Sequence, residues 1–428
     1  MIELEMREQS EMGKMQRLVD GKLGIISELE LLPNYHDLPQ IYRVRAYRNP
    51  LIDRNGREIS PAVSEGFGFK EELLPAKMAA VGEVIERYCS TFYKNHDMVV
   101  SSYRNITSEA ISPERIARFS DSQYQREGFV FENVNEDTVI PWVRGKSLVD
   151  KRSIWVPADL VFLVQNEHSH PIRDYTSNGL ACGSSYWQAV YASLCELIER
   201  DAFFLTWLLR LPAPRIKYTS LRGKSIHKLL KVYQEHGYRI VINELTTNLN
   251  VPTYLATAIS ETKWPRVAVA AKTSLNAEKA IKGALEELAG VISGLRDDRD
   301  RRPEFNPDYL GSHAFYYADG ERTELLNFYL ESEEIDLAVN EFGHLTGHEA
   351  VEMIRREFNK AQIDVAIVDL TTADIREAGL SVTRAIAPEL QSLYIGQPYL
   401  QSRRLWDLAA KYGIRKVEDL NLEIHPFS

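Results

Sequence analysis

Apolar residues recur at helical spacing in three segments that share one frame. The segments are Ala76–Tyr88 (AKMAAVGEVIERY), Ala189–Asp201 (AVYASLCELIERD) and Ala280–Ile292 (AIKGALEELAGVI). In each of them an alanine is followed seven residues later by a glutamate, which gives the pairs Ala76 and Glu83, Ala189 and Glu196, Ala280 and Glu287. We predict a helix over each segment. Each one follows a stretch of small residues or glycine, such as TSNGLACGSSYW before the second.

Two other segments, Arg239–Ala256 and Val365–Ala387, begin as apolar strands and then turn at a Thr-Thr pair. In the second, Thr371 or Thr372 is expected to cap a short helix that Gly379 ends. Strands and helices therefore alternate, and no Pro, Gly or Ser-rich linker divides the chain. The pattern predicts an α/β (α+β) fold of repeated βα units in one compact body. Ile52–Ile59 reads as a hairpin with Asn55 and Gly56 in its turn.

Composition and charge narrow the class of protein. The 428 residues are 44% hydrophobic and 26% charged, as in a globular protein, and the net charge is -10. This charge argues against broad binding to nucleic acid or to an anionic membrane. The first twenty residues lack the apolar core of a signal peptide, no long apolar run follows, and the three cysteines form no C-x-x-C. We predict a cytoplasmic protein. We also predict a homodimer, because homodimers are the commonest oligomers of soluble proteins.

Two of the predicted helices carry the same charged motif, E-x-x-E-R. Residues at i, i+3 and i+4 share one helix face, so Glu83, Glu86 and Arg87 point together, as do Glu196, Glu199 and Arg200. A single motif of this kind is usually a surface ion pair. Two such faces that converged would repel unless cations neutralised them, and Mg²⁺ with nucleotide phosphates fits this chemistry. A di-iron site would need histidine at the i+3 position.

The loop TSNGLACGSS, residues 176–185, supports a central site for ATP and Mg²⁺. Gly179 and Gly183 permit close approach, Ser177 and Ser184 offer hydroxyls, and the following helix start attracts anions. No Walker A loop is present.

The remaining polar stretches have simpler interpretations. His344 and His348 are four residues apart, but a capping box of Thr346 and Glu349 explains that stretch better than a metal. The histidines of residues 168–170 have no ligand frame around them. Arg296–Glu304 reads as a solvated, mobile loop.

Four ordered motifs resemble the YcaO family. They are AAVGEVIERYCS, WVRGKSLVDKRSIWVPADLV, TSNGLACGSSYWQAVYASLCELIERDAF and IVDLTTADIREAGLSVTRAIAPELQ. The resemblance begins near Gly21, which leaves residues 1–20 as an extension and 21–428 as a YcaO-like domain. It implies an ATP-using enzyme that modifies backbone amides of ribosomally made peptides. The chain is most similar to the D-type component of cyclodehydratases, which convert Cys, Ser or Thr into thiazoline or oxazoline in bacteriocin or peptide-antibiotic biosynthesis.

The resemblance also implies roles for individual residues. Glu83, Glu86, Glu196 and Glu199 would hold Mg²⁺ and phosphates, with Arg87 and Arg200 beside them, and Glu196 and Glu199 would be catalytic. Ser177, Ser184 and Glu287 would be weaker members of the cofactor site. The end of the chain, residues 421–428, is similar to a shortened proline-rich tail whose terminal carboxylate reaches the active site, which adds Ser428 to the catalytic residues. Ala79 and Ala192 stand where some family members have Ser and Gln.

Partners follow from the same resemblance. They are a ribosomal precursor peptide, a separate E1-like protein that binds its leader, and an FMN-dependent dehydrogenase that oxidises azolines. An alternative within the family is thioamide or amidine formation from the same activated amide. A noncatalytic docking scaffold is favoured only by Ala79 and Ala192, because retained carboxylate clusters without a ligand cost stability. A plain α/β structural protein would leave both acidic faces unexplained.

Overall fold

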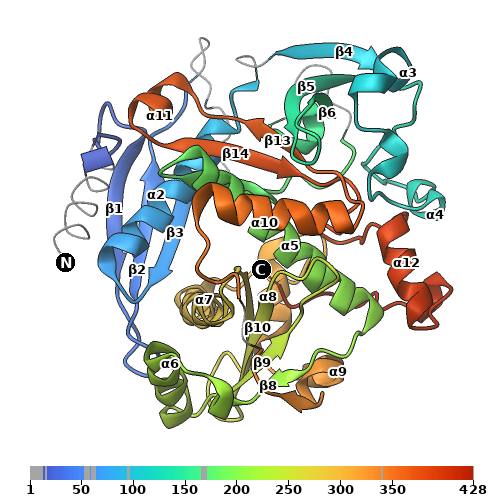
Figure 1. Ribbon diagram of the computed structural model, residues 1–428. Coiled ribbons are helices and arrows are strands. Elements are labelled where there is room, and N and C mark those ends of the chain that lie inside the picture. Colours follow the sequence, from blue (N-terminus) through green and yellow to red (C-terminus); the bar gives the residue numbers. More distant parts are fainter. Residues whose placement is uncertain are drawn as a thin grey trace.

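The predicted helices are the helical halves of βα units (Figure 1). The computed structural model describes residues 13–14, 17–52, 58, 64–93, 97–164, 171–338 and 341–427. The three segments predicted to be helical lie within α2 (Leu73–Cys89), α5 (Tyr186–Leu209) and α7 (Ala277–Asp297). Each helix directly follows a strand, namely β3 (Glu65–Lys70), β7 (Leu180–Gly183) and β11 (Val267–Thr273). The prediction of repeated βα units is therefore confirmed.

Among the described residues, an N-terminal sheet is formed by β1 (Ile26–Leu32), β2 (Tyr42–Arg48) and β3 in that order, with antiparallel pairs. Helix α2 covers one face of this sheet. Two glycines of β3 allow the helix to approach closely. A Cβ atom on Gly66 would lie 2.4 Å from the carbonyl oxygen of Ala80, and one on Gly68 would lie 1.9 Å from that of Ala76. The backbones of β3 and α2 therefore touch, and this contact positions the acidic face of α2.

A composite sheet combines strands from both halves of the chain. Its strands are β4 (Met98–Ser102), β5 (Val139–Ser147), β13 (Ala366–Asp369), β14 (Ser381–Ile386) and β7, in that order, with β6 (Ser153–Pro157) paired to β5. Its pairs are antiparallel, and Arg384 of β14 lies opposite Leu180 of β7. After β13, the predicted short helix is present as α11 (Ala373–Glu377), and Gly379 follows it with a φ of 79°, as predicted. Thr372 occupies the N-cap position, but its side chain makes no capping hydrogen bond.

A mid-chain sheet has the strand order β11, β10 (Thr253–Ile259), β9 (Arg239–Glu244), β8 (Arg215–Ile216), β12 (Glu334–Ile335). Strands β9, β10 and β11 are antiparallel, and β8 pairs with β12 in parallel. Helix α7 packs on β10 and β11, with α6 (Lys224–Glu235) beside it. The strand predicted at Arg239 is therefore present, and after its Thr-Thr pair the chain continues into β10.

Helix α5 occupies the centre of the molecule (Figure 1). It contacts β7 and β14 of the composite sheet, β11 of the mid-chain sheet, and α10 (Gly347–Lys360). The Ser185 hydroxyl accepts from the backbone N–H of Gln188 at its start, and Arg210 ends it in the left-handed conformation. Asp201 is fully buried, and its carboxylate accepts hydrogen bonds from Arg404 at 2.6–2.9 Å and from the backbone N–H of Gln391 at 2.9 Å. This charged residue of α5 is thus paired, as a buried charge must be.

Shorter helices complete the described chain. They are α3 (Tyr103–Ile106), α4 (Asp121–Tyr124), α8 (His313–Ala318), α9 (Asn327–Leu330) and α12 (Arg403–Lys411). Within the described ranges, none of the helices combines the length and apolar character needed to cross a membrane.

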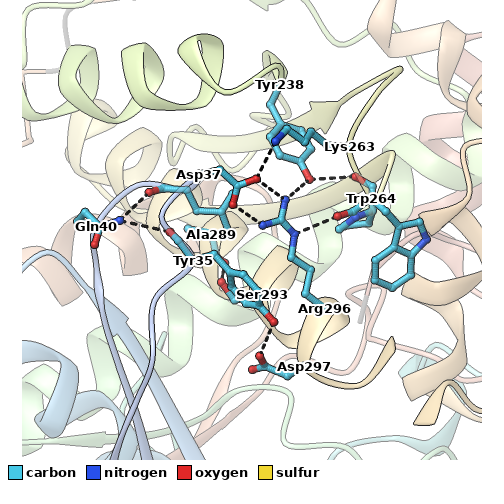
Figure 2. Close-up of polar contacts among 12 residues, drawn as sticks. Tyr35, Asp37, Gln40, Tyr238, Lys263, Trp264, Ala289, Ser293, Arg296 and Asp297 are labelled. Atoms are coloured by element: carbon cyan, nitrogen blue, oxygen red, sulfur yellow. Dashed lines mark hydrogen bonds and ion pairs between the residues drawn. The ribbon is translucent and has the colours of Figure 1, made fainter. Parts of the chain in front are cut away.

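The charged run at residues 296–304 is only in part the solvated loop that we predicted. Arg296 belongs to the last turn of α7, and its side chain is 11% exposed. Figure 2 shows its guanidinium directed at Asp37, which also accepts a hydrogen bond from Lys263 at 3.1 Å. Arg296 donates to the two Asp37 oxygens at 2.7 and 3.2 Å and to the carbonyl of Trp264 at 2.9 Å. The prediction was wrong for Arg296 because its partner lies far away in the sequence; residues 299–302 are exposed, as expected.

Asp37→Asn is expected to lower the free energy of unfolding by about 1–3 kcal/mol, because Arg296 would lose its charged partner in a mostly buried setting. Urea unfolding followed by circular dichroism measures the change. Asp298→Asn, which removes an exposed pair with Arg301, is the control and should change little. An Asp37→Asn midpoint equal to that of the wild type would contradict a stabilising role for this network.

Two smaller predictions have different outcomes. The capping box at Thr346 and Glu349 is wrong, because the side chain of Thr346 makes no capping bond to α10. Gly347, the first helical residue, has a φ of 56° rather than the helical value that a capping box requires. Ile52 pairs with Glu58 as the two sides of the predicted hairpin would, while Asn55 and Gly56 lie outside the described residues.

Candidate active site

The acidic face of α2 is bound to two strands. Oε2 of Glu83 accepts from the backbone N–H of Phe67 at 2.6 Å, and Oε1 accepts from Nη2 of Arg87 at 2.5 Å. Arg87 also donates to the carbonyl of Glu65. Oε1 of Glu86 accepts from the backbone N–H of Cys182 at 2.8 Å. The first E-x-x-E-R motif therefore connects β3 with β7 through its carboxylates, and Arg87 is an internal partner of Glu83.

The acidic face of α5 lies beside the end of β11. Glu199 has a side chain that is 3% exposed, and its Oε2 accepts from the backbone N–H of Thr273 at 2.9 Å. The Glu196 side chain is 24% exposed. Nη2 of Arg200 lies 3.9 Å from a carboxylate oxygen of each of them. The second motif thus places two carboxylates and one guanidinium together, and Glu196 is the most exposed of the three.

The third helix adds one carboxylate and its cation. Glu287 of α7 lies opposite Lys272 of β11, with 3.4 Å between Oε2 and Nζ. Burial raises the pKa of Glu287, but Lys272 and Arg200 outweigh this and hold the pKa below its ordinary value. Glu287, the weakest candidate from the sequence, therefore carries a negative charge at this site.

The pKa values show that the three faces converge. Burial raises the pKa of Glu86, which the nearby Glu196 and Glu83 raise further. Burial also raises the pKa of Glu196, and it raises that of Glu199 to about 7. For Glu199, Lys272 and Arg200 oppose the shift while Glu287 and Glu196 add to it. The charges of Glu86 on α2 and Glu287 on α7 thus act on those of Glu196 and Glu199 on α5.

Several buried polar atoms of Arg200, Arg384 and Asn178 have no hydrogen-bond partner among the described residues. These atoms are Nε and Nη1 of Arg200, Nε of Arg384 and Oδ1 of Asn178. Arg384 lies close enough to Glu196 that the carboxylate raises its pKa, although burial lowers that pKa to about 10. Asn178 and Arg384 line one small cavity beside α5. Guanidinium groups with free donors suit an anionic ligand such as a phosphate. The neighbouring carboxylates would repel such an anion unless a cation bound with it.

The carboxylates alone do not form a closed metal cage. Across the part of the chain that the structure describes, no three His, Cys, Asp or Glu side chains are arranged to hold a metal ion. One oxygen each of Glu83, Glu86 and Glu199 is instead bonded to a backbone N–H. Mg²⁺ usually takes one or two carboxylates and completes its octahedron with water and substrate phosphates. The residues present therefore fit Mg²⁺ that arrives with a nucleotide.

The other predicted residues lie around this cluster. The carbonyl of Ser177 accepts from the N–H of Leu180 at the turn before β7. The Ser184 hydroxyl donates to Oε1 of Gln188 at 2.5 Å, on the first turn of α5 and about two turns before Glu196. Ser184 thus supports the start of the helix rather than touching the carboxylates. Ser428 lies outside the described residues. His348 packs on Trp187, with ring centroids 4.4 Å apart, and belongs to no metal group.

Sequence reasoning missed Lys272, Arg384 and Asn178. Lys272 interrupts the apolar strand VAVAAKT, and Arg384 interrupts VTRAIA. A lone charge in a strand buried on both faces requires a partner, so this pattern was the available signal.

The fold and this site define a protein with a buried acidic centre for a cation and an anionic ligand. Residues 67–391 match the model of a family described as YcaO cyclodehydratase, ATP- and Mg²⁺-binding, and the chain belongs to the YcaO family. The resemblance and the cofactors predicted from the sequence, ATP and Mg²⁺, are thereby confirmed.

Two curated relatives are similar over different shares of their length. An uncharacterized protein in the tfuA 3′ region of Rhizobium leguminosarum bv. trifolii is 30% identical over 173 residues, which is 37% of this chain and 41% of that protein. An uncharacterized protein of Methanothermobacter thermautotrophicus is 27% identical over 329 residues, 74% of this chain and 79% of that protein.

Solved structures share the fold. A heterocyclase in complex with substrate and cofactor superposes with a TM-score of 0.79 at 20% identity over 98% of this chain and 57% of that chain. YcaO from Methanopyrus kandleri bound with AMPPCP and Mg²⁺ has a TM-score of 0.63 at 18% identity, over 90% and 91%. The E. coli microcin synthetase McbBCD complex with pro-MccB17 bound has a TM-score of 0.64 at 14% identity, over 94% and 96%. The predicted fold class is confirmed, and this chain spans a little over half the length of the first heterocyclase.

Proposed function

We propose that this chain is the ATP-dependent cyclodehydratase subunit that converts Cys, Ser or Thr of a ribosomal precursor peptide into thiazoline or oxazoline, for a bacteriocin or peptide antibiotic. The observation that carries the proposal is the convergence of carboxylates from α2, α5 and α7 around Arg200 and Arg384. Among the described residues, Nε and Nη1 of Arg200 and Nε of Arg384 are buried without a partner, while Nη1 and Nη2 of Arg384 donate to the carbonyls of Val161 and Thr176. Membership of the YcaO cyclodehydratase family supports the same chemistry.

The proposed reaction removes one water from the peptide for each ring. The side-chain sulfur or oxygen loses its proton and bonds to the carbon of the preceding amide carbonyl. The carbonyl oxygen then takes the terminal phosphoryl group, whose bond to ADP breaks. This oxygen leaves as inorganic phosphate, and the amide nitrogen loses its proton as the C=N bond of the ring forms. Phosphorylation is needed because the oxygen of an amide is a poor leaving group, and the protein accelerates the transfer by positioning and charge.

The residues divide this work by charge. Glu86, Glu196 and Glu199 would hold Mg²⁺, which when bound neutralises phosphate oxygens during transfer. Arg200 and Arg384 would donate to phosphate oxygens through the N–H groups that are free in the described structure. Glu83, bonded to Arg87 and Phe67, would be a weaker metal ligand that holds α2 against β3. Lys272 keeps Glu287 charged beside Glu199.

The proposal includes partners. The similar McbBCD protein is a complex with pro-MccB17 bound, which supports action on a precursor peptide within an assembly. We propose a separate E1-like protein for leader binding and an FMN-dependent dehydrogenase that oxidises the azolines. A homodimer and a cytoplasmic location remain predictions from the sequence.

The test is to combine the chain with its E1-like partner and precursor peptide, and to measure ATP consumption and peptide mass. The wild type is expected to remove one water per ring at the expense of ATP, and Glu196→Gln to reduce this rate by about a hundredfold or more. Glu357→Gln is the matched control, because Glu357 is a buried carboxylate of α10 bonded to Lys360 and Asn250, outside the site.

Other outcomes would replace the proposal. A peptide that exchanges oxygen for sulfur would establish thioamide formation, the alternative within the family. Nucleotide binding without any change of peptide mass, with both partners present, would favour the docking scaffold suggested by Ala79 and Ala192.

A further inference from the structure

The described end of the chain runs into the centre of the molecule beside α5 (Figure 1). The backbone N–H of Asn421 donates to the carbonyl of Leu208 at 2.8 Å. Trp207 donates through Nε1 to the carbonyl of Glu423 at 3.1 Å, and the Tyr317 hydroxyl donates to that of Ile424 at 2.5 Å. Residues 421–424 are therefore fixed along the second half of α5.

Aromatic rings hold the next residues of the chain, 425–427, in place. His425 is fully buried, and its Nε2 lies 3.1 Å from the carbonyl oxygen of Tyr394. Its ring packs against Phe204 and Tyr394, with centroids 5.0 Å away in each case. Phe427 is 3% exposed and packs on Phe203, with centroids 4.8 Å apart. The side chain of Phe427 is thus held against Phe203, which lies about one helical turn after Arg200 on α5.

Arg200 is in contact with this ring. The guanidinium carbon lies 4.2 Å from the centroid of Phe427, a distance at which a cation is attracted by an aromatic face. Nη2 of Arg200 lies 3.9 Å from a carboxylate oxygen of Glu196 and of Glu199, which is too long for a hydrogen bond. Nε and Nη1 of Arg200 have no partner among the described residues. The ring therefore supports the plane of the guanidinium and leaves its donors free.

We propose that Phe427 is a positioning residue for Arg200, held in place by the buried His425 and acting on the nucleotide only through the guanidinium. This inference rests on the proposed function, since it takes the phosphates of a nucleotide with Mg²⁺ as the group that Arg200 binds. Stacking restricts the rotation of Arg200, so less freedom is lost when phosphate binds.

The test compares the affinity of the full chain for AMPPCP with Mg²⁺, measured by calorimetry, in variants that differ at the ring. Phe427→Leu keeps an apolar side chain but removes the aromatic face, and is expected to weaken binding about fivefold to tenfold. Phe427→Tyr keeps the face and should stay within about twofold of the wild type. Phe427→Met is a second non-aromatic variant if the leucine variant does not melt cooperatively.

A double-mutant cycle separates positioning from general packing. In an Arg200→Gln background, Phe427→Leu should have no further effect on affinity, because the ring would have nothing left to orient. Equal affinity of Phe427→Leu and the wild type, or the same loss in both backgrounds, would overturn the inference while leaving the proposed function intact. A wild-type chain that binds no nucleotide would instead overturn the proposed function, and the role of Phe427 with it.

Discussion

Glu199→Gln is expected to weaken the binding of ATP with Mg²⁺ by at least about a hundredfold and, at the same time, to make the nucleotide-free protein more stable. Glu199 is almost fully buried, and its pKa of about 7 shows that its charge is held at a cost in the absence of a ligand. Glutamine keeps an oxygen that can accept from the N–H of Thr273, so the local hydrogen bond survives. Removing the charge then relieves the buried site but deprives the cation of one of its proposed carboxylate ligands.

The gain in stability should depend on pH in a defined direction. An unfolded chain releases the Glu199 proton near the ordinary pKa of 4.5, whereas the folded chain keeps it until about pH 7. Between these values the folded form binds more protons, so its stability falls as pH rises. The variant lacks this loss, so its advantage over the wild type should grow across this window and level off at about 1–3 kcal/mol near pH 8.

The measurement is thermal or urea unfolding of both proteins, without nucleotide, at several pH values. Glu286→Gln is the matched control, because Glu286 is a carboxylate of α7 that is 3% exposed but fully paired with Lys70 at 3.0 Å and Lys282 at 2.6 Å. Its replacement should lower stability, the opposite sign. A Glu199→Gln protein that is less stable than the wild type at every pH would show that Glu199 is a structural ion-pair residue.

The helices and their carboxylates could be predicted because their signal is local. Apolar spacing defines a helix within a few turns, and the E-x-x-E-R frame then places Glu196 and Glu199 on one face whatever the tertiary structure. Because the same E-x-x-E-R motif occurs on two predicted helices, the sequence also suggested that their acidic faces meet. The third segment has only Glu287 of this frame, and the structure places its helix, α7, beside the other two.

The cationic side of the site could not be read in this way. Arg384 reaches Glu196 because β14 pairs with β7, a contact between residues far apart in the sequence. Lys272 and Asn178 likewise become site residues only when the sheets pack against α5. Arg296 shows the same limit outside the site, because its partner Asp37 lies between β1 and β2, far away in the sequence. Charges with distant partners look like solvated residues in a sequence, since nothing local distinguishes the two cases.

Gly68→Ala is expected to destabilise the protein by about 3 kcal/mol or more and to weaken the binding of ATP with Mg²⁺ with it. The new Cβ would lie 1.9 Å from the carbonyl oxygen of Ala76, and because that oxygen belongs to the backbone, helix α2 itself must move. Glu83 and Glu86 are carried by this helix, and their bonds to Phe67 and Cys182 are too short to survive such a shift unchanged. Urea unfolding and calorimetric titration measure the two effects.

Gly82→Ala provides the control within the same helix. Its Cβ would lie 3.6 Å from that of Cys182, an ordinary contact, and alanine favours the helical backbone by about 0.5–1 kcal/mol. This variant should therefore be as stable as the wild type or slightly more so, and should bind nucleotide normally although it is next to Glu83. If Gly68→Ala had the same urea midpoint as the wild type, α2 could shift away from β3 without a loss of stability. The position of the α2 carboxylates would then have to depend on their own bonds to β3 and β7 instead of on the packing of the helix.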